Sequence, residues 1–74
     1  MIKELDRVVL TTDFPEHNLK SGDIGAVVLV HHKKEGYEVE FVTLDGETVA
    51  VVSLLTSQLR SIGRREIAQA RVLA

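Results

Sequence analysis

The chain has 74 residues, a formal net charge of −2 and no Cys, with 45% hydrophobic and 27% charged residues. This composition excludes disulfides and thiolate zinc sites, and it argues against a disordered chain. A domain of this size buries only about 60% of the surface that its unfolded chain exposes, so oligomerisation is a common means of stabilising it.

The charge is divided unevenly along the chain. Residues 1–59 carry five basic and ten acidic side chains, whereas residues 60–74 carry four Arg and one Glu. The acidic body argues against a nucleic-acid-binding protein. The N-terminus is charged from its third residue, and no apolar run approaches the roughly 20 residues of a membrane span, so we expect a cytoplasmic protein.

Runs rich in β-branched residues predict the strands. The first run covers Leu5–Thr11 and the second Ile24–His32, with a loop rich in turn-forming residues between them. Strict alternation places Val27 and Leu29 on the opposite side of the second strand from Val28. Both sides are apolar, which is typical of a strand that is covered on both faces.

Asp45-Gly46 is the strongest turn signal in the chain. It lies between Tyr37–Leu44 and Glu47–Leu54, and Asp-Gly favours a two-residue type I′ hairpin turn. That turn would pair Leu44 with Glu47 and Val42 with Val49. One face of the hairpin then carries the core residues Tyr37, Val39, Phe41, Ala50 and Val52, and the other carries Glu38, Glu40, Val42, Leu44, Val49 and Val51.

The rest of the chain completes an all-β domain. Ser53–Ile62 predicts a short 3₁₀ turn and a fifth strand, so residues 1–63 are expected to form a small SH3-like five-stranded barrel. Residues 64–74 place Ile67, Ala70 and Leu73 roughly on one stripe. We expect this segment to be a short C-terminal helix or a flexible tail.

Reactive side chains are few. Asp13, Glu16 and His17 share one loop, and we interpret them as solvated surface groups; a small hydrolase or metal enzyme is the alternative. His31 and His32 are adjacent on a strand and point to opposite faces, although either one at an oligomer interface could make assembly pH-sensitive. We therefore expect no enzyme activity, no cofactor and no metal site.

A barrel encloses one interior. The apolar residues on the other faces of its strands must therefore be covered by something outside the barrel. Monomers rarely expose large contiguous apolar patches, and pairing of identical copies is the commonest solution. The predicted oligomer interface consists of Val27, Leu29, Val42, Leu44, Val49 and Val51.

Three segments carry a family resemblance: LDRVVLTTDFPEHNLKSGDIGAVVLVH, GYEVEFVTLDGETVAVVSL and GRREIAQAR. Together they resemble a family of small bacterial proteins, common in cyanobacteria, that is classed as a domain of unknown function. The resemblance implies a stand-alone protein, often encoded beside another small protein. The segment GDIGAVV also resembles the strand entry of KOW and other SH3-like barrels, many of which bind RNA.

Three functions follow as hypotheses. The first is a non-enzymatic interaction module that forms a homo-oligomer. The second is an antitoxin-like or immunity-like regulator that binds a neighbouring gene product, with the basic tail as a docking segment. The third is KOW-like binding to RNA or a ribonucleoprotein, which the acidic body disfavours.

Overall fold

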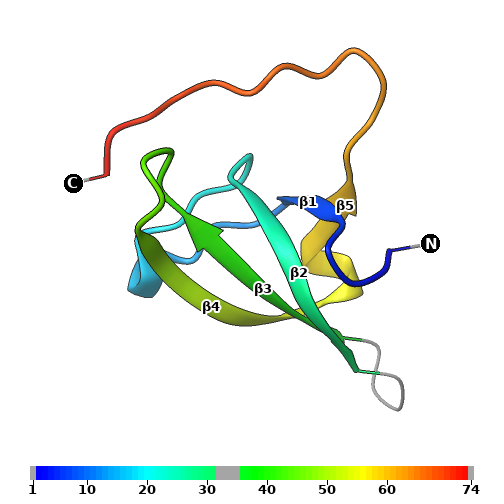
Figure 1. The fold of residues 1–74 in the computed structure, drawn as a ribbon. Coiled ribbons are helices and arrows are strands. Elements are labelled where there is room, and N and C mark those ends of the chain that lie inside the picture. The colour runs from blue at the N-terminus through cyan, green and yellow to red at the C-terminus, as the bar shows by residue number, and fades with distance from the viewer. Residues whose placement is uncertain (1, 32–35, 74) are drawn as a thin grey trace.

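The computed structural model describes residues 2–31 and 36–73, which form one antiparallel five-stranded sheet (Figure 1). Its elements are β1 (Arg7–Leu10), the 3₁₀ turn η1 (Pro15–His17), β2 (Ile24–His31), β3 (Gly36–Val42), β4 (Thr48–Leu55), the 3₁₀ turn η2 (Thr56–Gln58) and β5 (Leu59–Ser61). The expected all-β class is confirmed, and so is the 3₁₀ turn that leads into a short fifth strand.

The strands follow the order β4-β3-β2-β1-β5, so β4 and β5 are the two ends of the sheet. The sheet curls strongly around one interior (Figure 1). The barrel is not closed, because η2 connects β4 to β5 without pairing them. One long edge, that of β4, therefore stays without a partner strand in the described part of the chain.

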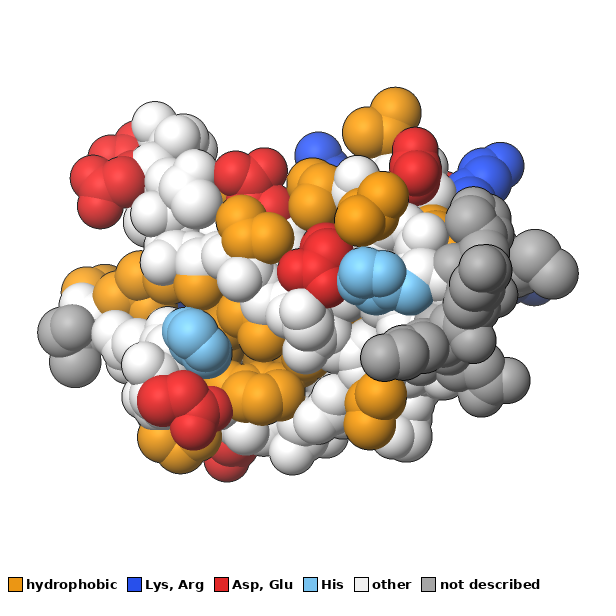
Figure 2. Space-filling model, turned by 90° about the horizontal axis from the view of Figure 1, so that it is seen from below, with side chains coloured by type: hydrophobic (Ala, Val, Ile, Leu, Met, Phe, Trp, Pro, Cys, Tyr) orange, Lys and Arg blue, Asp and Glu red, His pale blue; other side chains and the backbone are white. Residues whose placement is uncertain are grey.

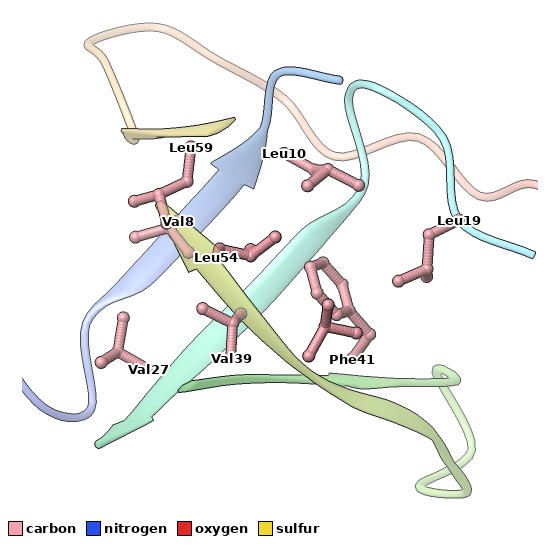
Figure 3. Packing of buried hydrophobic residues seen from close by; sticks show 9 residues of the cluster. Val8, Leu10, Leu19, Val27, Val39, Phe41, Leu54 and Leu59 are labelled. Carbon is pink, nitrogen blue, oxygen red and sulfur yellow. The ribbon is translucent and has the colours of Figure 1, made fainter. Parts of the chain in front are cut away.

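The interior of the curled sheet holds a single apolar core (Figure 3). Its buried members are Val8, Leu10, Leu19, Val27, Val39, Phe41, Val52, Leu54 and Leu59. Gly25 on β2 also belongs to the inner face, where a Cβ would lie 2.6 Å from Val39 Cγ1 and 2.9 Å from Phe41 Cε1. Only glycine allows β2 to pass this close to β3.

The predicted alternation in β2 is wrong at Val27 and Val28, whereas Leu29 lies outside as predicted. A β-bulge lies between Val27 and Leu29, so that Val27 pairs with Val39 while Leu29 pairs with Glu38. The extra residue reverses the facing of the strand. Val27 is consequently fully buried in the core, which contradicts its predicted place in an oligomer interface, and Leu29 turns outward.

The Asp45-Gly46 hairpin is confirmed, but the two-residue turn is wrong. Thr43 N donates to Glu47 O and Gly46 N to Thr43 O, which leaves a three-residue loop with Gly46 at φ +94°. A bulge on β4 then restores the expected register, with Phe41 opposite Ala50. Val42 faces Thr48 instead of Val49, and Val49 is partly buried against the core rather than presented on the outer face.

For residues 64–74 we expect a short helix or a flexible tail, and the described part of this segment is not helical. The described residues 62–73 contain no helix and form an extended tail that arches over one end of the sheet (Figure 1). Arg65 has φ 61°, in the left-handed region, within a turn at the start of this tail. Only about three helical turns were available, too few for a helix to be stable without packing.

Replacing Gly25 with Ala tests the close approach of β2 to β3. The added Cβ would also lie 3.0 Å from the carbonyl oxygen of Glu40, a backbone atom that cannot rotate away. We expect Gly25→Ala to lower the free energy of unfolding by about 1–3 kcal/mol, the usual cost of overpacking. Urea unfolding measures the change, and Val28→Ala, at an exposed site on the same strand, should stay within about 0.5 kcal/mol. Equal effects of the two changes would contradict the packing argument.

Candidate interaction surface

The convex side of strands β2, β3 and β4 forms the outer sheet face. Two cross-strand rows define it: Ala26, Glu40 and Val51 lie side by side, as do Leu29, Glu38 and Ser53. Val42 and Leu55 lie near its two ends, on β3 and β4. Val51 and Leu55 are 53% and 60% exposed, although the intervening Val52 and Leu54 are buried.

Two carboxylates lie in the middle of this face, and both are hydrogen-bonded. Glu38 Oε2 accepts from His31 Nε2 at 2.7 Å and from Ser53 Oγ at 2.5 Å. Glu40 Oε2 accepts from Thr48 Oγ1 at 2.9 Å. The His31 and Ser53 hydrogen bonds lower the pKa of Glu38, so this carboxylate stays ionised in neutral solution.

Apolar side chains surround the two carboxylates. Leu29, Val42 and Val51, all predicted from the sequence, are exposed on the outer sheet face. Leu44 is 91% exposed at the tip of the hairpin. Val28 and Leu55 are exposed as well and were missed, because the bulge turns Val28 outward and the predicted fourth strand ended one residue before Leu55.

The free edge of β4 borders the outer sheet face. β4 reads TVAVVSLL and contains neither a charged residue nor proline. In Figure 1 β4 runs along the lower left side of the sheet, and Figure 2, which looks from below, shows hydrophobic side chains with acidic and His side chains among them. An eight-residue apolar strand with an unpaired edge is a site at which another chain can add.

In the loop that carries the reactive side chains, Asp13 is hydrogen-bonded to the backbone. Asp13 Oδ1 accepts from the backbone N–H of Ser21 at 2.8 Å, and η1 carries Glu16 and His17 at the surface. Among residues 2–31 and 36–73, no three His, Asp or Glu side chains come together as a metal site would need. His32 lies outside the described residues, whereas His31 pairs with Glu38.

Comparison with known proteins identifies the family. A family model described as a domain of unknown function, DUF4926, matches residues 4–61. The chain belongs to this family. Neither the curated proteins nor the solved structures that were searched gave a match. The DUF4926 match spans all five strands and ends at the last residue of β5, before the tail.

The tail that follows the DUF4926 domain is fastened at two points. At its base, Glu66 accepts two hydrogen bonds from Arg60, at 2.7 and 2.8 Å, and one from Gly63 N at 2.5 Å. Near its end, Arg71 donates to both carboxylate oxygens of Asp23, at 2.8 and 2.5 Å, and to the carbonyl oxygen of Asn18 at 3.0 Å. We call these contacts the base clasp and the end clasp.

The two clasps lower the pKa values of the carboxyl groups that form them, Glu66 and Asp23. Arg60 and the N–H of Gly63 lower the pKa of Glu66 to about 2. Partial burial raises the pKa of Asp23, but the hydrogen bonds from Arg71 and Lys20 N outweigh burial and hold it below its usual 3.8. Between the clasps the tail is solvated, and Ile67 is 92% exposed.

None of the described helical segments is long or apolar enough to cross a membrane. The helical elements of the described residues are the single 3₁₀ turns η1 and η2, and the tail is extended.

Acid should open both clasps. A carboxyl whose pKa is lowered in the folded state stabilises that state above its unfolded pKa, and the contribution is lost as the pH falls through the folded pKa. For Glu66 this window runs from its ordinary 4.5 down to about 2. We expect the side-chain ¹³C shift of Glu66 to titrate near pH 2 and that of Asp23 below 3.8. A Glu66 midpoint near 4.5 would show that the base clasp does not form.

Proposed function

We propose that this DUF4926 protein is a non-enzymatic interaction module that self-associates through the outer sheet face and the adjoining edge of β4. The observation that carries the proposal is the exposure of Val51 and Leu55 on a strand without a single charged side chain. Both residues lie on the end strand of the sheet, next to backbone groups that no described strand pairs.

The energetics favour association of this surface. Removing apolar surface from water yields about 25 cal/mol per Å², and a buried Val or Leu side chain contributes about 1.5–3 kcal/mol. Val51 and Leu55, both on β4, each remain more than half exposed in the isolated chain. A domain this small has a limited core of its own, so burial of these side chains between copies adds to its stability.

Val51→Lys tests the proposal. The new ammonium group would stand beside the β4 edge, where two copies that meet there would bring like charges together and lose the apolar contact of Val51. We expect light scattering after size-exclusion chromatography to find an oligomer for the wild type and a monomer for Val51→Lys. Because Val51 is half exposed, the fold itself should persist, as circular dichroism would show.

The matched control is Leu44→Lys. Leu44 is more exposed than Val51 but lies at the hairpin tip, away from the β4 edge. This variant should keep the assembly state of the wild type. A wild type that is monomeric at every concentration, with Val51→Lys unchanged in size and stability, would contradict the proposed function.

A further inference from the structure

The backbone of β4 shows which of its groups face the free edge. Leu55 N donates to the side-chain oxygen of Gln58 at 2.8 Å, so the N–H of Leu55 points away from β3. In an antiparallel strand, the direction of the N–H and C=O groups alternates from residue to residue. Val51 and Ser53 therefore direct their N–H groups to the same free edge, whereas Val52 and Leu54 direct theirs to β3.

The sequence of β4 leaves this edge open to another strand. Natural proteins protect long edge strands with charged side chains, proline or short length. β4 is eight residues long and contains no charged side chain and no proline. β5, at the opposite end of the sheet, is only three residues long and carries Arg60. The bulge in β4 lies near its start, between Thr48 and Ala50, so the stretch from Ala50 to Ser53 stays regular.

Charge decides how a second copy can approach. If two outer sheet faces stacked about a two-fold axis, the carboxylates of Glu38 and Glu40 would be buried against those of the other copy. Burial of like charges is strongly unfavourable. Pairing along the β4 edges brings together strands that carry no charge and leaves Glu38 and Glu40, both on β3, in water.

We propose that the partner of the β4 edge is β4 of a second copy, antiparallel to the first about a two-fold axis, so that two five-stranded sheets join into one. The inference rests on the proposed function, since it takes self-association as given and names its mode. The groups that meet are the outward N–H and C=O groups of Val51 and Ser53 in both copies. Because the pairing is isologous, the outer sheet faces of the two copies also become continuous, with Val51 of one beside the exposed apolar side chains of the other.

Residue-resolved amide hydrogen exchange by NMR tests the pairing. In a monomer the amides of Val51 and Ser53 exchange rapidly with solvent, while those of Val52 and Leu54 are protected by β3. We expect the protection of Val51 and Ser53 to rise at least tenfold from low to high micromolar protein, in parallel with the oligomer fraction. Val52 and Leu54 should be protected at both concentrations, which also reports that the fold is intact.

Two Lys variants separate edge pairing from stacking of the faces. Leu29→Lys places a charge on the outer sheet face, two strands away from the β4 edge, and should retain the oligomer and the protection of Val51 and Ser53. Val51→Lys should lose both while keeping protected amides at Val52 and Leu54.

The outcomes distinguish the two claims. An oligomer whose Val51 and Ser53 amides stay unprotected would overturn the β4 pairing and leave the proposed function standing. The same holds if Leu29→Lys dissociates the oligomer as completely as Val51→Lys does. A wild type that remains monomeric throughout would overturn the proposed function itself, and the pairing with it.

Discussion

A sheet of five short strands can enclose only one interior. Each strand has two faces, and the face that is not in this interior must be covered by something else or lie exposed to solvent. In this chain the inner face receives Val8, Leu10, Val39, Phe41 and Leu54, which fill the curl of the sheet (Figure 3). Gly25 leaves room on this inner face for the side chains of Val39 and Phe41. The apolar side chains of the other face, together with the edge at which the sheet fails to close, then lie on the surface.

The sequence predicts most of this arrangement, because period-two patterns and the Asp-Gly turn are local signals. Val39, Phe41 and Val52 lie inside as expected, and Leu29 and Val51 lie outside. The errors come from single inserted residues. With a bulge at Val28, Val27 lies in the core, and with the bulge in β4, Val49 packs against the core. Neither bulge leaves a pattern in the residues themselves, because both depend on how neighbouring strands pair.

The tail shows a different limit of local reasoning. Its helix formers favour a helix, but the structure has an extended segment held by Arg60 and Glu66 at one end and by Arg71 and Asp23 at the other. The end clasp joins residues 48 positions apart, a separation at which no spacing rule operates. The tail also lies beyond residues 4–61, the part of the chain that the DUF4926 model matches.

The central claim is that the uncovered face and edge of this sheet bind a second copy. Sedimentation velocity of the unmodified protein over a wide range of concentrations tests it most directly. Each chain has a mass of 8.2 kDa, and the account predicts a reversible shift from that mass to a multiple of it as concentration rises. One species of 8.2 kDa at every concentration would contradict the account.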